Sequence, residues 1–111
     1  MLEKIGIDIV ENKRISLRKN FLNKVLTNAE LLKCESLLTK SAKIEFAAGR
    51  WAVKEAIIKT LNKDEMIPMS QIEIGYNDLN PIILNKKLSN ILVSISHEKK
   101  YSIGMAVKKN D

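Results

Sequence analysis

Two acidic residues of this chain stand where the surrounding pattern favours apolar side chains. Asp8 lies among isoleucines in the alternating stretch KIGIDIVE, residues 4–11, although aspartate is a poor strand residue. Glu55 lies on one face of a long helical stretch, and the other residues at helical spacing on that face are apolar. Those apolar residues are Ile44, Ala48, Trp51 and Ile58. A buried carboxylate is costly unless a positive charge or a metal lies beside it, so both acids are candidate metal ligands.

The residue types indicate magnesium rather than zinc. Zinc prefers histidine and cysteine, whereas Mg²⁺ retains water and accepts one or two carboxylates together with substrate phosphates. Arg50, Lys54 and Lys59 lie near Glu55 in the sequence and would complement phosphate charge. Ordinary interpretations also exist: Asp8 could be solvated on an exposed strand face, and Glu55 could form a helix ion pair with Lys59. The spacing alone does not show that the two carboxylates meet.

The chain has one histidine and one cysteine. His97 follows Val93 and Ile95 in an alternating strand and is expected on their side, where a structural role competes with a functional one. Cys34 lies in a leucine-rich helical stretch and is expected to pack in the interior. A lone cysteine cannot form an internal disulfide, which fits a reducing cytoplasm.

The composition bounds the class of protein. A length of 111 residues predicts one domain spanning 1–111 with a modest core. With 45% hydrophobic and 29% charged residues, the chain is expected to be soluble and globular. We find no apolar run of membrane-spanning length and no signal-peptide pattern. A net charge of +6 favours an anionic partner, while two Phe, two Tyr and one Trp are too few for a stacking platform on single-stranded nucleic acid.

The elements that must position these residues follow from periodicity and capping. Strands are expected at 4–11, 71–76, 81–84, 91–97 and 101–107. Helices are expected at 12–26, at 28–37 after the capping-box sequence Thr27-Asn28-Ala29-Glu30, and at 43–62. This order indicates an α+β fold in which an antiparallel sheet packs with one long and two shorter helices.

Three segments together resemble the holo-acyl-carrier-protein synthase family of 4'-phosphopantetheinyl transferases, in its short bacterial type. GIDIVENKRI resembles the N-terminal signature of that family, and VSISHEKKYSIGMAV resembles its closing hairpin. EFAAGRWAVKEAIIKTL resembles its central helix, with the core pattern F-x-x-G-R-[FW]-A-x-K-E. The segments occur in the family's order and cover essentially the whole chain.

The resemblance implies the 4'-phosphopantetheinyl transferase fold and a Mg²⁺-dependent reaction. A serine hydroxyl of apo acyl carrier protein would attack the β-phosphate of coenzyme A, and 3',5'-ADP would leave. Asp8 and Glu55 match the family's metal ligands, and Glu55 and Lys59 are the implied catalytic residues, with Glu55 as the candidate proton acceptor. The positions implied to bind coenzyme A are Arg50, Lys54, Lys59, Pro81, Ser96 and His97.

The resemblance also implies partners. The acidic acyl carrier protein is expected to dock on the basic first helix through Arg14, Arg18, Phe21 and Lys24, with the two arginines one turn apart. Short members of the family are typically homotrimers with the coenzyme cleft between subunits, and self-association would supplement the modest core. The implied setting is fatty acid and lipid biosynthesis in the cytoplasm, without nucleic acid or membrane partners.

Two departures and two rivals accompany the resemblance. The connection NKDEMIPMS, residues 62–70, lacks the glycines often found there, and the turn that usually reads Gly-Lys-Pro is Leu79-Asn80-Pro81. That turn borders the coenzyme in relatives, so its missing lysine is expected to weaken a phosphate contact.

A basic nucleic-acid-binding domain would explain the charge but not Glu55. An inactive relative that binds coenzyme A or a carrier without turnover conflicts with the presence of Asp8, Glu55 and Lys59.

Overall fold

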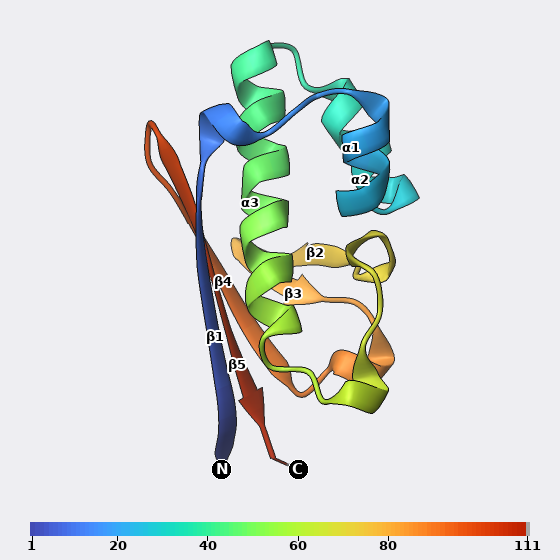
Figure 1. Ribbon diagram of the computed structural model, residues 1–111, viewed down its shortest axis with the longest axis vertical. Coiled ribbons are helices and arrows are strands. Elements are labelled where there is room, and N and C mark those ends of the chain that lie inside the picture. The colour runs from blue at the N-terminus through green and yellow to red at the C-terminus, as the bar shows by residue number, and fades with distance from the viewer. Residues whose placement is uncertain (111) are drawn as a thin grey trace.

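The computed structural model describes residues 1–110 and consists of three layers (Figure 1). The first layer is a three-stranded antiparallel sheet with the strand order β1-β5-β4. The long helix α3 lies along one face of this sheet, two short helices lie on the other side of α3, and a two-stranded antiparallel hairpin lies beside β4 (Figure 1). The strands are β1 (Leu2–Glu11), β2 (Ile74–Asn77), β3 (Asn80–Ile83), β4 (Ile91–His97) and β5 (Tyr101–Lys109). The helices are α1 (Lys19–Val25), α2 (Asn28–Ser36) and α3 (Lys40–Ile58).

The predicted α+β class, the five strands and the set of one long and two shorter helices are confirmed, but several boundaries were wrong. The long helix ends at Ile58 and not at 62, and the second strand begins at Ile74 because Met69–Gln71 is a 3₁₀ turn. Residues 12–26 do not form one helix: Asn12–Arg14 is a 3₁₀ turn, and α1 begins only at Lys19. Between them Ile15 is extended, and the hydroxyl of Ser16 accepts the backbone N–H of Arg18 at 3.1 Å, a local bond that competes with helix formation. The long helix begins earlier than predicted because Thr39 is its N-cap and accepts the N–H of Ala42.

The helix α3 packs directly on the sheet because glycines face it. A Cβ atom on Gly104 of the central strand would lie 2.3 Å from the backbone nitrogen of Val53. A Cβ atom on Gly6 of β1 would lie 2.0 Å from the carbonyl oxygen of Ala56. No side chain fits at either position, so the helix backbone and the strand backbones are in contact. This close packing brings residues of β1 next to residues on the side of α3.

The opposite face of the sheet carries exposed apolar side chains. Ile5, Ile7 and Ile9 of β1 are each about 60% exposed, at 61%, 58% and 59%. Met105 of β5, the cross-strand partner of Ile7, and Leu92 of β4 are 39% and 56% exposed. Apolar side chains gathered on one sheet face are unusual on a monomer, and faces of this kind often bind another protein or a membrane.

None of the helices within residues 1–110 combines the length and the apolar character needed to cross a bilayer.

Candidate active site

Asp8, Glu55 and Lys59 converge beside the contact between β1 and α3. Asp8 lies on the helix-facing side of β1, opposite Gly104 of β5. Glu55 lies in the last turn of α3, and Lys59 is the C-cap residue one turn further on. The Lys59 ammonium lies 3.5 Å from an Asp8 carboxylate oxygen and donates to the carbonyl of Ile7 at 2.7 Å. Asp8 and Glu55 line the same hollow, about 300 Å³ in volume.

The two carboxylates influence each other electrostatically. Partial burial raises the pKa of Glu55 above its ordinary value, and the negative charge of Asp8 raises it further. The charge of Lys59 acts in the opposite direction but does not cancel these effects. The two carboxylates therefore repel each other, and a cation bound between them would offset that repulsion.

The donor set fits Mg²⁺. Within residues 1–110, no group of three or more histidine, cysteine, aspartate or glutamate side chains gathers into a closed metal cage. The pair Asp8 and Glu55 therefore leaves most coordination positions to water or to substrate oxygens. That arrangement suits Mg²⁺, which gives up its water reluctantly and binds through one or two carboxylates plus phosphate oxygens.

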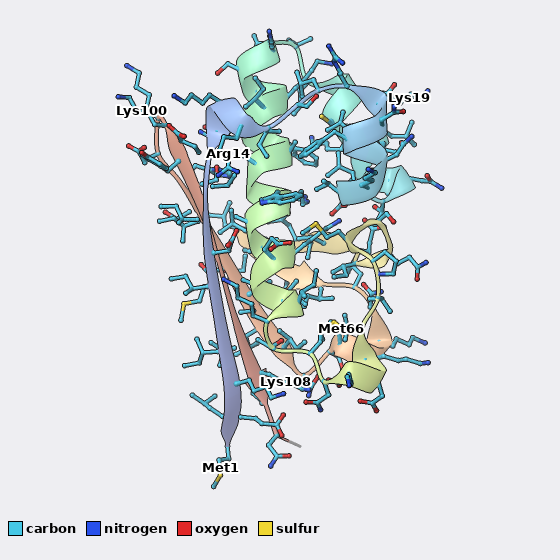
Figure 2. The ribbon with its side chains drawn as sticks, in the orientation of Figure 1. Met1, Arg14, Lys19, Met66, Lys100 and Lys108 are labelled. Atoms are coloured by element: carbon cyan, nitrogen blue, oxygen red, sulfur yellow. The ribbon has the colours of Figure 1, made fainter. Side chains whose placement is uncertain are left out.

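Two of the residues predicted to dock the carrier line the same hollow. Arg14, in the 3₁₀ turn after β1, and Phe21 of α1 contribute to its wall together with Trp51 of α3. The Phe21 and Trp51 rings stack at a centroid distance of 5.6 Å, and Figure 2 shows Arg14 where β1 ends, next to α3.

The predicted one-turn spacing of Arg14 and Arg18 on a shared helix was wrong, because Arg18 is the residue before α1 and Arg14 lies in a separate turn. Arg14, Arg18 and Lys24 are all exposed nonetheless.

Lys54 does not lie at a surface. It has 0% exposure, and its ammonium donates to the carbonyls of Val25 and Met69, at 2.7 and 3.0 Å, and to the carboxylate of Glu30. An ammonium group has three N–H donors, and all three are used within the protein. The structure therefore contradicts the prediction that Lys54 contacts coenzyme phosphates, and it gives this side chain a role in joining α1 and α2 to α3.

Arg50 lies partly in the interior and partly at a second hollow. Its Nε donates to the Glu30 carboxylate at 3.0 Å. Its guanidinium carbon lies 4.4 Å from the ring centroid of Phe46 and 5.5 Å from that of Tyr76. Arg50, Phe46 and Tyr76 line a hollow of about 520 Å³ at the base of β2. A guanidinium held by one carboxylate and two rings can still offer its remaining donors to an anion in that hollow.

The other predicted coenzyme contacts lie apart from Asp8. His97 and Ser96 stand at the end of β4, on opposite faces of the strand, and Pro81 lies in β3. Because β5 separates the edge strands β1 and β4, Asp8 and His97 are about two strand spacings apart across the sheet, roughly 10 Å. Within one chain, Asp8, Glu55 and Lys59 therefore lie together, His97 lies apart from them against Gly49 of α3, and Ser96 points to the sheet face opposite α3.

The comparisons with known proteins decide the family. The family model described as the 4'-phosphopantetheinyl transferase superfamily matches residues 4–106. The chain belongs to this superfamily. It is 58% identical over 111 residues to the holo-[acyl-carrier-protein] synthase of Mycoplasma mycoides subsp. mycoides, covering 100% of this chain and 98% of that protein. It is 37% identical over 117 residues to the same enzyme of Thermodesulfovibrio yellowstonii, covering 96% and 98% of the two chains.

Solved structures of the superfamily share the fold. The holo-(acyl-carrier-protein) synthase from Bacillus anthracis, in complex with CoA (3',5'-ADP), superposes with a TM-score of 0.86 at 32% identity, covering 100% of this chain and 99% of that one. The enzyme from Helicobacter pylori, in complex with coenzyme A, has a TM-score of 0.73 at 26% identity, with 96% and 100% coverage. The predicted family, fold class and transferase class are thus confirmed, against the rival of a nucleic-acid-binding domain.

The buried polar residues of this transferase were not found from the sequence. Glu30 was recognised as part of a capping box, which the structure confirms, but its ion pairs with Arg50 and Lys54 join residues 20 and 24 positions apart. Ser102 is completely buried, although it reads as an ordinary polar residue in an alternating strand. Cys34 is buried, as predicted, and burial raises the pKa of its thiol, which makes it a poor nucleophile.

Proposed function

We propose that this chain transfers 4'-phosphopantetheine from coenzyme A to a serine of an apo acyl carrier protein, in a Mg²⁺-dependent reaction that releases 3',5'-ADP. The observation that carries the proposal is the convergence of Asp8, Glu55 and Lys59 at one hollow. The names of the relatives and the coenzyme complexes of similar structures support the same conclusion.

In this proposal Asp8 and Glu55 hold the metal ion. Bound Mg²⁺ would supply positive charge that offsets the negative charge of the coenzyme phosphates. Lys59 reaches the same place from the end of α3, where its side chain is half exposed at 50%. One N–H of Lys59 donates to the Ile7 carbonyl and its charge pairs with Asp8, so a further N–H can donate to a phosphate oxygen and stabilise the charge that develops there.

The proposed step is a direct displacement at phosphorus. The carrier serine oxygen forms a bond to the β-phosphorus of coenzyme A, and the bond from that phosphorus to the oxygen bridging the diphosphate breaks. The electron pair leaves with 3',5'-ADP. Glu55 accepts the serine proton.

The remaining coenzyme contacts are proposed to come from Arg50, Ser96, His97 and Pro81. Since these lie across the sheet from Asp8, we propose that one complete site combines residues of two copies in a homotrimer. The exposed apolar face formed by Ile5, Ile7 and Ile9 supports self-association, because burying such a face removes apolar area from water.

The carrier is proposed to dock over the hollow through Arg14, Phe21, Arg18 and Lys24. The net charge of +6 suits an acidic partner. A basic residue at the rim and an aromatic ring in the wall would place the carrier serine beside Glu55. We further propose that residues 1–111 act as one catalytic domain, in the cytoplasm, in support of fatty acid and lipid biosynthesis.

The test is intact-protein mass spectrometry of an apo acyl carrier protein incubated with this chain, coenzyme A and Mg²⁺. The expected result is a carrier that gains one phosphopantetheine group, with no gain when EDTA is present. No gain with several carriers and a folded chain would overturn the proposal in favour of an inactive relative, with the turn at Leu79-Asn80-Pro81 as the first position to revert. Gain that persists in EDTA would refute the metal requirement.

A further inference from the structure

A chain of hydrogen bonds leads from the interior to His97. The Nδ1 atom of His97 lies 2.9 Å from the hydroxyl oxygen of Ser102, its cross-strand partner on β5. That hydroxyl lies 2.8 Å from the side-chain oxygen of Asn12, just after β1. Ser102 is fully buried. The three residues come from β4, β5 and the end of β1, so the chain of bonds crosses the whole width of the sheet.

The orientation of the Asn12 amide is fixed independently of His97. Its amide nitrogen faces the backbone carbonyls of Glu98 and Lys99, each at 3.4 Å. Its backbone N–H donates to the carbonyl of Lys100 at 2.7 Å, at the tip of the β4–β5 hairpin (Figure 2). If the amide were turned over, its oxygen would face two carbonyl oxygens. The oxygen of Asn12 must therefore point to Ser102.

The direction of every proton in the chain follows. An amide oxygen can only accept, so the Ser102 hydroxyl donates its one hydrogen to Asn12. The Ser102 oxygen then has only lone pairs to offer to His97, and the Nδ1 atom of the imidazole must carry the hydrogen. In a neutral ring that leaves Nε2 unprotonated. Within residues 1–110, no protein group makes a hydrogen bond to Nε2.

We propose that Asn12 and Ser102 are positioning residues that hold His97 as the Nδ1–H tautomer and leave Nε2 as the nitrogen available to a ligand. This rests on the proposed function, in which His97 contacts a phosphate of coenzyme A. When a phosphate binds, Nε2 is the only ring nitrogen that can take up a proton, and the resulting imidazolium has an N–H donor at each nitrogen. The Ser102 oxygen accepts from Nδ1 in both the neutral and the protonated ring.

The helix α3 fixes the plane of the same ring. A Cβ atom at Gly49 would lie 2.5 Å from Cε1 and 3.0 Å from Nε2 of His97, so the ring edge rests on the bare backbone of the helix. The Ser102 hydroxyl contacts the ring at Nδ1, and the backbone at Gly49 contacts its opposite edge. Together they restrict His97 to one rotamer and one tautomer, although it lies at the end of a strand.

The tautomer can be measured directly because the chain has a single histidine. Long-range ¹H–¹⁵N correlation of uniformly ¹⁵N-labelled protein, without substrate and at about pH 8, where an ordinary imidazole is neutral, distinguishes the two ring nitrogens. The expected result is a protonated Nδ1 and an unprotonated Nε2. The Nε2–H form, which predominates for free histidine in water, would overturn the proposal.

Variants of Asn12 test the cause. In Asn12→Ala the Ser102 hydroxyl loses its acceptor and is free to donate to Nδ1, so the ring should shift to the Nε2–H form. Ser94→Ala, an exposed position on the same strand, is the matched control and should leave the tautomer unchanged. If Asn12→Ala does not fold, Ser102→Ala serves instead, with the same expected shift.

Steady-state kinetics then connect the tautomer to the coenzyme. At about pH 8, Asn12→Ala should lower the KM for coenzyme A with a smaller change in kcat, because its neutral ring already presents an Nε2–H donor to the phosphate, whereas the original ring must first take up a proton. An unchanged KM in a variant whose tautomer has shifted would refute the link to the coenzyme. The NMR measurement of the tautomer needs no substrate, so it remains a valid test even if the chain shows no transfer activity. The tautomer proposal and the proposed function can therefore be refuted independently.

Discussion

The long helix carries two clusters of acidic and basic side chains, and they differ in how their charges are satisfied. In the inner cluster, Arg50 and Lys54 meet Glu30 in the interior, with exposures of 6%, 0% and 2%. In the outer cluster, Glu55 and Lys59 meet Asp8 at the surface, where the Asp8 and Lys59 side chains are 21% and 50% exposed. Lys54 and Glu55 are adjacent in the sequence, yet they belong to different clusters, since neighbours on a helix point about 100° apart.

The inner cluster is closed. The Glu30 carboxylate accepts from Arg50, from Lys54 and from the backbone N–H groups of Thr27 and Ile74, and no buried side-chain nitrogen or oxygen within residues 1–110 lacks a partner. The outer cluster is open, because its two carboxylates are close enough for Asp8 to raise the pKa of Glu55 and both line a hollow. Closed charge clusters hold elements together, whereas open ones are available for ligands. The predictions below test this difference, from the largest expected effect to the smallest.

Glu30→Ala should cause the largest loss of stability, because it leaves Lys54 and Arg50 buried without their counter-charge. Removing one partner of a buried ion pair typically costs about 3–5 kcal/mol, a large part of the stability of a domain of this size. Denaturant unfolding measures the change. Glu35→Ala, on an exposed position of the same helix, is the control and should change the free energy of unfolding by less than about 0.5 kcal/mol. Equal effects of the two substitutions would show that the inner cluster is not a structural centre.

Glu55→Gln and Asp8→Asn should each reduce phosphopantetheine transfer at least a hundredfold, equivalent to about 2.7 kcal/mol, while the protein remains as stable as the original. Both amides keep the shape of the side chain but lose the charge that would hold Mg²⁺. The measurement is the initial rate of carrier modification, with circular dichroism to check folding. Near-normal rates in both variants would mean that the outer cluster is not the metal site.

Mg²⁺ should raise the melting temperature of the unmodified chain without any substrate. At a concentration ten times the dissociation constant, a ligand that binds only the folded state adds about 1.4 kcal/mol to the free energy of unfolding. Differential scanning fluorimetry measures the shift, with Na⁺ at matched ionic strength as the control. The shift should disappear in Glu55→Gln and persist in Glu30→Gln, which changes only the inner cluster.

Arg14→Glu should weaken docking of the carrier, raising its KM about fivefold, since a rim charge contributes about 1 kcal/mol at most. The KM for coenzyme A should change less, because Arg14 lies at the mouth of the hollow and not among the proposed coenzyme contacts. A matched substitution, Lys87→Glu in the turn before β4, carries the same charge change away from both hollows. Equal effects of both would indicate a general charge effect instead of local docking.

The smallest expected effect is a change in the pH dependence of stability. Burial and the charge of Asp8 raise the pKa of Glu55 in the folded state, so the folded protein holds this proton more tightly than the unfolded chain. The contribution of Glu55 to stability is therefore present below its ordinary pKa and is lost as the pH rises through the raised value. Unfolding curves of Glu55→Gln should show a flatter pH dependence over that interval, by a fraction of 1 kcal/mol.

The sequence predicted the open cluster better than the closed one. Asp8 and Glu55 could be recognised because each breaks an apolar pattern within its own element. Glu30 could not, because its capping role was a complete local explanation and its partners come from a different helix. Lys54 shows the reverse error: a lysine in a basic motif reads as a phosphate ligand, and only the tertiary structure reveals that three protein oxygens surround it.

The first strand illustrates a different limit. Its alternation predicted β1 to within two residues, because a period of two is a strong signal. The helix predicted over 12–26 failed because Ser16 makes a local hydrogen bond that periodicity does not detect. The separation of Asp8 from His97 depends on strand order, in which the last strand inserts between the first and the fourth, and nothing local in the sequence specifies that order.

The alternation of β1 fixes which of its side chains face the helix and which face outward. Even-numbered residues, with Gly6 and Asp8, face α3, while Ile5, Ile7 and Ile9 face outward. Inserting one residue before Asp8 would force a choice between keeping the acid at the helix and keeping the upstream isoleucines outside, whereas inserting two would preserve both. The one irregularity in the pairing of β1 with β5 falls between Leu2 and Lys4, upstream of both sets. Insertions and deletions should therefore be tolerated at the start of β1. Beyond Lys4, those of an odd number of residues should not be tolerated.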